Sequence, residues 1–387
     1  MKKKIIYWLD WKKKIVTSNN STKSLSLKEL ENYPITVYCD ANTFAWLQAF
    51  QGYKQDEKGN IAIGKAIIKE KRGGDENNSE GEGTQALKLL HKLVPSFSAE
   101  HPNSSPEFFE LAKKWKISPR FENLQQGIFK DVWYIDIKSC YPKIMKEYPL
   151  PCGEPEHLQD PQLIEKSLWE KKKGFVKFYC ENYAEIKNQQ IPFIPDSDYE
   201  YEDKMKSVIK GRKRIFLYTR LFEAFKKNYK IKGRLIYTDF WVFSEKKGCA
   251  NKFLDYCQEL RNSGDKKGKS LANSLWGALG KKGHVGYNYY PWHLAVSHLA
   301  LLKTYHLYRN FQPQNIIEIR SDAIYVKEKI PTKLMEQEDA YTFKFSTKFG
   351  FGQREIFNYE TGEIKSPLSS ERREESIKKW LNKNQTN

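Results

Sequence analysis

The chain has 387 residues, of which 39% are hydrophobic and 14% aromatic, and it carries a formal charge of +18 at pH 7. This composition excludes a disordered chain and predicts an ordered protein long enough for two or three domains. The charge indicates an anionic partner, most commonly nucleic acid, and the 23 tyrosines and 10 tryptophans suit base stacking beside phosphate contacts.

The six cysteines form no Cys-x-x-Cys pair and have no histidine at zinc spacing. This argues against structural zinc and favours a reducing compartment. The apolar run from Ile5 ends at Asp10, which is too short for a signal peptide, and no segment approaches the roughly 20 apolar residues of a membrane span. We expect a cytoplasmic protein that does not associate with a membrane.

Residues 1–83 are expected to form a small α/β region that ends in a polar, glycine-rich loop, and residues 84–130 a helical connector. The strands expected there are Ile5–Leu9, Ile35–Cys39 and Ile61–Ile68. The helices expected there are Leu25–Asn32, Thr43–Phe50, Thr84–Leu93 and Phe108–Trp115.

The clearest chemical signal lies in Asp131–Glu154. A buried strand, Val132–Ile137, brings Asp136 to its end, and a tight turn leads into a helix that starts at about Pro142. A buried carboxylate is costly unless a cation neutralises it, and a metal ion is the usual partner. The N–H groups of the turn and helix start could seat a phosphate beside that metal. The alternative is an aspartate that only caps the helix.

A basic element follows at Lys204–Arg234, after strands expected at Gly174–Cys180 and Ile191–Ile194. It contains twelve Lys or Arg and one acid, and its interspersed apolar residues indicate a structured segment. Contact with a phosphate backbone is expected; the alternative is a solvated helix face. The candidate contacts are Lys210, Arg212, Lys213 and Arg214.

A helical hairpin is predicted from Lys252–Leu260 and Ser270–Leu279, with cations at its tip. Lys269 and Asn273 are four residues apart and therefore share a helix face, which Trp276 and Gly277 continue. Lys269 alone could equally be an ordinary surface lysine. Further along the chain we expect a helix at Pro291–Arg309, strands at Ile316–Ile319, Ala323–Val326 and Phe343–Phe357, and a C-terminal helix at Ser370–Leu381.

Three motifs occur in one order along the chain. They are Asp136-x-x-Ser139-x-Tyr141-Pro142, Lys269-x-x-x-Asn273-Ser274-x-Trp276-Gly277, and an apolar strand broken by Ser321-Asp322-Ala323. Together they resemble the palm and fingers motifs of family B DNA polymerases. The continuation Tyr148–Pro155 is most similar to the protein-primed polymerases of bacteriophages and linear plasmids.

The resemblance implies an α/β (α+β) fold of right-hand architecture, with helices on one face of an antiparallel palm sheet, short helical fingers and a minimal thumb. The expected parts are a degenerate or replaced exonuclease-like region (1–83), the connector (84–130), the first palm part with an insertion (131–203), the basic element and fingers (204–279), the second palm part (280–365) and a C-terminal helix as minimal thumb (366–387).

The resemblance also implies template-directed DNA synthesis from a primer 3′-hydroxyl, with dNTPs, a DNA primer-template and a terminal or priming protein as partners. Two Mg²⁺ ions, for which Mn²⁺ can substitute, would be held by Asp136, Asp322 and the carbonyl of Ile137. Roles in nucleotide binding are implied for Ser139, Cys140, Tyr141, Arg261, Lys269, Asn273, Trp276 and Gly277. Tyr141 would reject a ribose 2′-hydroxyl, and Trp276 replaces the family's usual tyrosine.

Several positions depart from the family pattern. Arg320 stands where the family has a first acid, and it would either lower metal affinity or contact primer phosphate. Lys348 or Arg354 would hold the primer terminus. The exonuclease carboxylate motifs are missing, which predicts no proofreading. Only 44 residues separate Gly277 from Asp322, an interval in which the highly processive phage enzymes of this family hold an insertion that encloses DNA. The resemblance therefore implies that this insertion is absent and that processivity is low.

Two alternatives remain open at this point. One is a terminal transferase or primer-independent polymerase that uses the same metals with loose template demands. The other is a non-catalytic nucleic-acid-binding protein on a decayed polymerase scaffold, suggested by Arg320 and the missing exonuclease motifs. The histidines of the helix at Pro291–Arg309 have no acidic partner at ligand spacing, so we expect them to make packing or backbone contacts.

Overall fold

The computed structural model describes residues 7–10, 15–18, 21–26, 32, 36–39, 61–63, 66–70, 81–94, 102, 105–114, 121–194, 208–280, 289–351, 356–358 and 364–365. The chain divides into two compact units, Met1–Gln85 and Ala86–Asn387. Within the described residues, no helix is both long and apolar enough to cross a membrane.

The first unit contains a six-stranded mixed sheet in the order β3-β2-β1-β4-β6-β5, in which β4 pairs in parallel with both β1 and β6. The strands are β1 (Tyr7–Asp10), β2 (Ile15–Ser18), β3 (Ser21–Ser26), β4 (Thr36–Cys39), β5 (Ile61–Ile63) and β6 (Ala66–Glu70).

Two expectations for this unit are wrong. Leu25 lies in β3 and not in a helix, because it alternates with serines in the period-two pattern of a strand and pairs with Val16. Ile61–Ile68 is a hairpin of β5 and β6 rather than one strand, because Gly64 interrupts the apolar run. The helix expected at Thr43–Phe50 lies outside the described residues.

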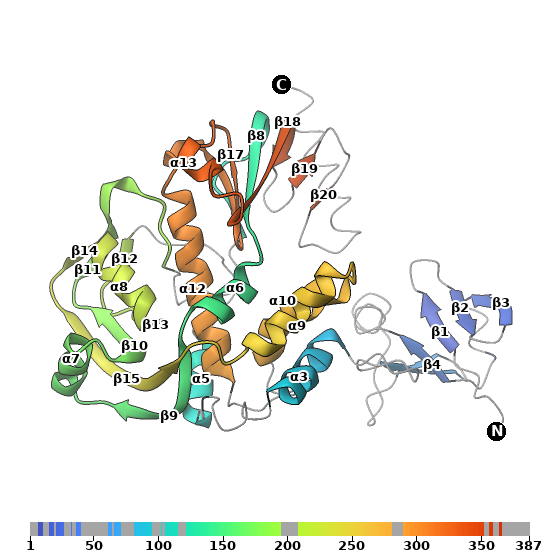
Figure 1. The fold of residues 1–387 in the computed structure, drawn as a ribbon, viewed down its shortest axis with the longest axis horizontal. Coiled ribbons are helices and arrows are strands. Elements are labelled where there is room, and N and C mark those ends of the chain that lie inside the picture. The colour runs from blue at the N-terminus through green and yellow to red at the C-terminus, as the bar shows by residue number, and fades with distance from the viewer. Residues whose placement is uncertain are drawn as a thin grey trace. The chain divides into compact units, whose positions relative to one another are not determined.

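The second unit is built on a seven-stranded sheet in the order β20-β19-β18-β8-β17-β16-β7 (Figure 1). Every neighbouring pair in it is antiparallel. Its strands are β7 (Phe121–Asn123), β8 (Gly127–Ile137), β16 (Ile316–Arg320), β17 (Ala323–Val326), β18 (Tyr341–Phe351), β19 (Ile356–Asn358) and β20 (Ile364–Lys365).

The two faces of this sheet differ. Ile135 and Ile137 of β8 belong to the main core cluster, which also contains the buried residues of helices α6 (Cys140–Glu147) and α12 (Tyr290–Tyr308). On the opposite face, Val132, Tyr325 and neighbouring aromatic rings form a separate cluster. Since strand side chains alternate between faces, Asp136 lies on this second face. The predicted antiparallel palm with helices on one face is confirmed.

Helix α12 lies in the core on the helix-covered face of the palm sheet. It is apolar on all sides and almost completely buried, as expected of a helix at the centre of a large core. It contacts α6, the hairpin helix α10 (Lys267–Leu279) and α8 (Thr219–Asn228). Two of its histidines make the expected backbone contacts, and His306 packs against the Tyr305 ring. Nδ1 of His298 accepts from the N–H of Tyr218 at 2.9 Å, and Nδ1 of His293 lies 3.1 Å from the carbonyl of Trp276.

The buried His298 gives stability a defined pH dependence. Burial, with a contribution from His293, lowers the pKa of His298 to about 3. The ring stays neutral in the folded protein but titrates near 6.5 when the chain is unfolded. Its contribution to the free energy of unfolding is therefore complete above pH 6.5 and declines as the pH falls below that value. We expect wild type to lose about 1 kcal/mol more unfolding free energy than His298→Gln between pH 7 and pH 5.5. Urea unfolding at both pH values measures this, and equal losses would contradict it.

Two smaller sheets complete the second unit. One has four strands in the order β13-β10-β15-β9, and the other has three in the order β12-β11-β14. Their strands are β9 (Leu150–Leu158), β10 (Lys173–Cys180), β11 (Tyr183–Ile186), β12 (Val208–Lys210), β13 (Arg214–Tyr218), β14 (Tyr229–Lys232) and β15 (Leu235–Lys246). The described short helices are α3 (Glu82–Leu93), α5 (Pro106–Lys114), α7 (Pro161–Trp169), α13 (Thr332–Met335), η1 (Lys187–Gln189) and η2 (Pro313–Asn315).

The segment Ile191–Ile194 is not the expected strand. Its N–H groups at Phe193 and Ile194 donate to the hydroxyl of Tyr229, at 3.3 Å each, so a side chain satisfies backbone groups that a sheet would otherwise pair. The apolar residues of this segment are buried in the core, and within the described residues the segment is not paired with a strand.

The predicted helical hairpin is present as α9 (Asn251–Asn262) and α10. α10 begins three residues earlier than expected, and Gly268 explains how the two helices approach. A Cβ at Gly268 would lie 2.3 Å from the carbonyl oxygen of Cys257, so only glycine fits there. The C-terminal helix expected at Ser370–Leu381 lies outside the described residues.

Candidate active site

Two aspartates meet at one end of the palm sheet. Asp136, near the end of β8, pairs with Ala323, and the N–H of Ile137 donates to the backbone carbonyl of Asp322 at 3.0 Å. Asp322 lies in the two-residue connection between β16 and β17, where Ser321 adopts a positive φ of 55°. The tight hairpin therefore brings Asp322 beside Asp136 from 186 positions away in the sequence.

The two carboxylates interact unfavourably with each other. Burial, reinforced by the charge of Asp136, raises the pKa of Asp322 to about 6. The Tyr134 hydroxyl, two residues before Asp136 on the same strand face, is hydrogen-bonded to the Asp136 carboxylate. Burial and the nearby negative charges raise the pKa of Tyr134 above its usual range, so Tyr134 remains a proton donor to Asp136.

A divalent cation would relieve this repulsion. The ligands are carboxylate oxygens, which Mg²⁺ and Mn²⁺ prefer. In the part of the chain that is described, no three His, Cys, Asp or Glu side chains come together at metal-ligand spacing. Two carboxylates suit an ion that takes its remaining ligands from substrate phosphates and water, as Mg²⁺ does in nucleotide-handling sites. The residues present therefore fit the expected metals.

Arg320 lies in the same cross-strand row as Asp136. The register aligns Arg320 with Ala323, Ala323 with Asp136, and Asp136 with Thr342. The guanidinium of Arg320 is 3.9 Å from the carboxylate of Glu318, and these side chains are only 15% and 2% exposed. On this distance we assign Arg320 as a buried counter-ion of Glu318. The charges of Asp136, Asp322, Glu318 and Arg320 sum to −2, so this end of the sheet keeps a net negative charge.

The turn after β8 forms a donor-rich corner. Ser139 has a positive φ of 52° and precedes α6, which begins at Cys140 rather than at the expected Pro142, because the left-handed residue lets the first helical turn start directly after it. The guanidinium of Arg261, from the tip of the α9–α10 hairpin, donates to the hydroxyl of Ser139 at 3.2 Å. The structure thus brings together two predicted nucleotide-binding residues that are 122 positions apart.

An aromatic stack connects this corner with the fingers hairpin. The Tyr141 ring stacks on Trp276 at 4.4 Å between centroids, and Trp276 stacks on His293 at 4.8 Å. The indole N–H of Trp276 is shared between the carbonyl of His293 and the hydroxyl of Ser297. The Tyr141 hydroxyl is 3.0 Å from that of Ser321, and burial raises the pKa of Tyr141 above its usual range. Tyr141 is therefore held from both the hairpin and the Asp322 turn.

The remaining predicted residues of α10 lie at its surface. Lys269 and Asn273 are exposed. A Cβ added at Gly277 would meet no atom of the described chain within 4 Å, so packing inside the protein does not require glycine at this position. The space beside Gly277 is open to a ligand.

Two groups of predicted DNA contacts lie apart from the carboxylates. Lys210, Arg212, Lys213 and Arg214 come together at the turn between β12 and β13, on the smaller sheets. Lys348 is exposed on β18, six residues beyond Thr342, which corresponds to about 20 Å along the strand. Arg354 lies outside the described residues.

Sequence reasoning missed two residues near the carboxylates. Tyr134 could have been found from its i, i+2 relation to Asp136, although aromatic residues are frequent in strands. Lys303 of α12 pairs with Glu147 at 3.2 Å and influences the pKa of Cys140, a buried thiol whose pKa burial raises. No local pattern distinguishes Lys303 from other lysines, because its position depends on how α12 packs against α6.

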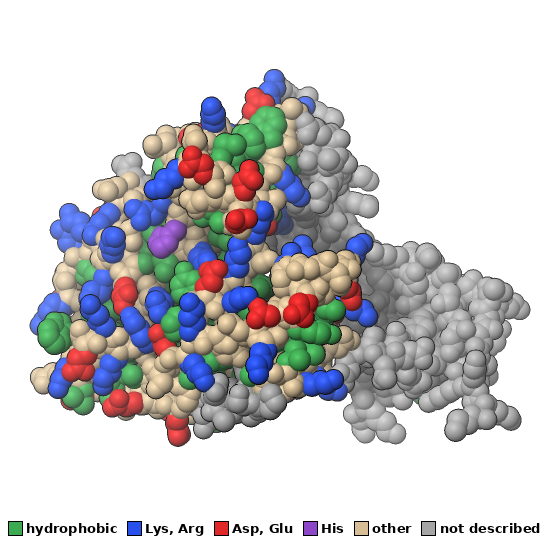
Figure 2. All heavy atoms as spheres, viewed as in Figure 1, with side chains coloured by type: hydrophobic (Ala, Val, Ile, Leu, Met, Phe, Trp, Pro, Cys, Tyr) green, Lys and Arg blue, Asp and Glu red, His purple; other side chains and the backbone are tan. Residues whose placement is uncertain are grey.

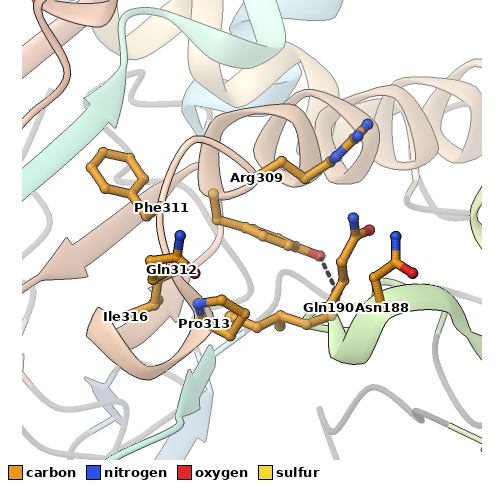
Figure 3. Close-up of a pocket in the computed structure, with 9 residues that line it drawn as sticks. Asn188, Gln190, Arg309, Phe311, Gln312, Pro313 and Ile316 are labelled. Atoms are coloured by element: carbon orange, nitrogen blue, oxygen red, sulfur yellow. Dashed lines mark hydrogen bonds between the residues drawn. The ribbon is translucent and has the colours of Figure 1, made fainter.

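A separate pocket of about 220 Å³ lies between η1 and the connection from α12 to β16 (Figure 3). Asn188, Gln190, Arg309 and Phe311 are among its lining residues, and the Tyr308 hydroxyl donates to the carbonyl of Ile191 at 3.3 Å beside it. Ile316 of this pocket is at the opposite end of β16 from Ser321 and Asp322. The pocket therefore belongs to a different part of the palm.

Comparison with known proteins identifies a family and a fold for this chain. Residues 120–359 match the family model for DNA polymerase type B, organellar and viral. None of the curated proteins compared with the chain matches it. Phi29 DNA polymerase in its post-translocation binary complex with primer-template DNA has a similar structure, with a TM-score of 0.63, 14% sequence identity, and coverage of 92% of this chain and 86% of that chain.

The ternary complex of Phi29 DNA polymerase with primer-template DNA and incoming nucleotide substrates gives the same TM-score of 0.63 at 14% identity, with coverage of 93% and 88%. At this level of identity, the likeness establishes the fold. The family model covers more than half of the chain and includes Asp136, Tyr141, Lys269 and Asp322.

Proposed function

This chain belongs to the type B DNA polymerases of the organellar and viral family, and we propose that it extends a primer 3′-hydroxyl under the direction of a DNA template by two-metal nucleotidyl transfer. It is a DNA-directed DNA polymerase, as the motifs predict. The observation that carries the proposed mechanism is the pairing of Asp136 with Asp322 at one end of the palm sheet.

The roles of the acidic residues follow from their environment. Asp136 and Asp322 would hold two Mg²⁺ ions. When bound, these ions would activate the primer hydroxyl and stabilise the leaving pyrophosphate. Tyr134 orients the Asp136 carboxylate through its hydrogen bond. The tight turn at Ser321 fixes Asp322 against the end of β8. The backbone carbonyl of Ile137 remains our candidate for a further ligand.

The nucleotide would lie between the turn after β8 and the exposed face of α10. Backbone N–H groups at Ser139, Cys140 and Tyr141 would bind the triphosphate, because the start of α6 offers unpaired donors. Arg261, already at Ser139, and the exposed Lys269 would neutralise the outer phosphates. Asn273 and Gly277 would lie against the new base pair.

Tyr141 is expected to control the choice of sugar. Its ring is fixed by Trp276 and its hydroxyl by Ser321, so it can act as a rigid wall against a ribose 2′-hydroxyl. We expect Tyr141→Ala to raise the ribonucleotide-to-deoxynucleotide ratio of kcat/KM by about a hundredfold, or about 2.7 kcal/mol. Trp276→Ala should change the ratio in the same direction by a smaller factor.

Single-nucleotide incorporation with matched dNTP and rNTP pairs measures this selectivity. Trp276→Phe keeps the stacking ring and is the matched control, with a ratio close to wild type. If Tyr141→Ala accepts ribonucleotides no better than wild type does, Tyr141 has no role in sugar selection.

Absent proofreading, low processivity and a priming protein are further parts of the proposal. The first unit lacks the paired exonuclease carboxylate motifs in sequence. Only ten residues, 280–289, connect α10 to α12, which leaves little chain for an element that encloses DNA. A terminal protein remains the expected partner for initiation on the basis of the Tyr148–Pro155 motif.

Extension of a 5′-labelled primer tests the proposal. Template-complementary addition that needs Mg²⁺ or Mn²⁺ would support it. Equal addition to the primer without template would assign a terminal transferase instead. DNA binding without addition at any metal concentration would assign a non-catalytic binding protein. Limited product length at an excess of primer-template would support low processivity.

A further inference from the structure

The three-stranded sheet β12-β11-β14 has one buried and one exposed face. The central strand β11 pairs antiparallel with both neighbours. Ala184 of β11 and Ile209 of β12 are buried in the core, and Ile231 of β14, which is aligned with Ala184, packs against the same core. The residues before and after these three therefore point away from the core. This sheet exposes a regular surface to solvent.

One cross-strand row of this surface consists of a tyrosine between two lysines. The register places Tyr183 opposite Lys210 on one side and opposite Lys232 on the other. Tyr183 is 37% exposed, and both lysines are exposed. Directly opposed side chains have Cβ atoms about 5 Å apart, so both ammonium groups can flank the ring. We call Lys210, Tyr183 and Lys232 the lysine–tyrosine row.

The lysine–tyrosine row is not occupied by contacts within the described chain. None of its three side chains takes part in a hydrogen bond, ion pair or ring contact there. The next row contains Val208, Glu185 and Lys230, so its single acid is balanced by one lysine. The exposed Arg212 lies in the turn that leaves β12. In Figure 2, Lys and Arg side chains gather at the edge of the molecule formed by these strands.

We propose that this sheet face binds single-stranded nucleic acid, with a base stacked on Tyr183 and the adjoining phosphates on Lys210 and Lys232. An exposed aromatic ring within a basic surface is the arrangement that binds unpaired bases without sequence preference. A duplex does not offer this contact, because its bases are already stacked on each other. The proposal deepens the proposed function, since it assigns a single-stranded segment of the polymerase's own substrate to a surface away from Asp136 and Asp322.

Fluorescence anisotropy with a labelled oligothymidylate tests the proposal without metal or dNTP, so the result does not depend on catalysis. Tyr183→Ala should weaken binding by about tenfold or more, while Tyr183→Phe should keep nearly wild-type affinity. Lys210→Ala with Lys232→Ala should reduce the slope of log affinity against log salt by about 1.4, because each contacted phosphate of a single strand contributes about 0.7. Affinity for a duplex of equal length should change little with Tyr183→Ala.

Unchanged single-strand affinity of Tyr183→Ala would overturn the proposal, as would an equal loss of duplex affinity. Loss of affinity in Tyr183→Phe as large as in Tyr183→Ala would exclude stacking. Thermal unfolding of each variant separates a binding defect from a folding defect. If Tyr183→Ala does not fold, the salt dependence of the Lys210→Ala and Lys232→Ala double variant tests the same surface. If wild type extends a primer on its template but Tyr183 and the two lysines contribute nothing to single-strand binding, this inference is refuted and the proposed function still stands.

Discussion

Replacing either Asp136 or Asp322 by asparagine is expected to reduce the rate of primer extension by at least about a thousandfold. Asparagine keeps the size of the side chain but removes the charge that would hold the metals. The fold should tolerate the change at Asp322, because burial and the charge of Asp136 already disfavour its ionised form. Single-turnover extension with saturating dNTP and Mg²⁺ is the measurement.

Asp131→Asn provides the matched control. Asp131 is exposed on the same strand, β8, and its positive φ of 55° suits asparagine. Its extension rate should equal that of wild type. The Asp136 and Asp322 variants should still bind primer-template DNA. Extension by Asp322→Asn within tenfold of wild type would show that the pair is not the catalytic centre.

Replacing Arg320 by methionine is expected to lower the free energy of unfolding by about 3 kcal/mol. The side chains are similar in length, but Glu318, at 2% exposure, would lose its guanidinium partner. Buried carboxylates are stable only when paired, so the cost is that of an uncompensated charge rather than of lost packing. Urea unfolding at pH 7 measures the change.

The double variant Arg320→Met with Glu318→Gln distinguishes this explanation from its rival. It should recover most of the lost stability, because neither position of the pair then carries a charge. If Arg320 instead contacts primer phosphate, Arg320→Met would keep wild-type stability and lose primer-template affinity. That outcome would contradict the assignment of Arg320 as a counter-ion.

Local sequence patterns predicted most of what lies around the carboxylates. The apolar run Val132–Ile137 predicted the strand that carries Asp136, and the apolar strands on either side of Ser321 predicted the hairpin that carries Asp322. The four-residue spacing of Lys269 and Asn273 predicted their shared helix. These signals depend on backbone periodicity, which one short segment of chain contains completely.

Features that depend on long-range pairing could not be predicted in this way. The row of Lys210, Tyr183 and Lys232 requires three strands to meet in one register. The stack of Tyr141 on Trp276 joins residues 135 positions apart. The Glu318–Arg320 pair is the exception, because an acid and a base at i and i+2 of one strand share a face and could have been recognised from sequence.

We propose above that this chain copies a DNA template with the paired aspartates as its catalytic centre. The most direct test uses four primer-templates that differ only in the first templating base, each incubated with every dNTP singly and with Mg²⁺. We predict that each template directs addition of its complementary nucleotide alone and that Asp322→Asn adds none. Addition of the same nucleotide on all four templates, or no addition by wild type, would contradict the account.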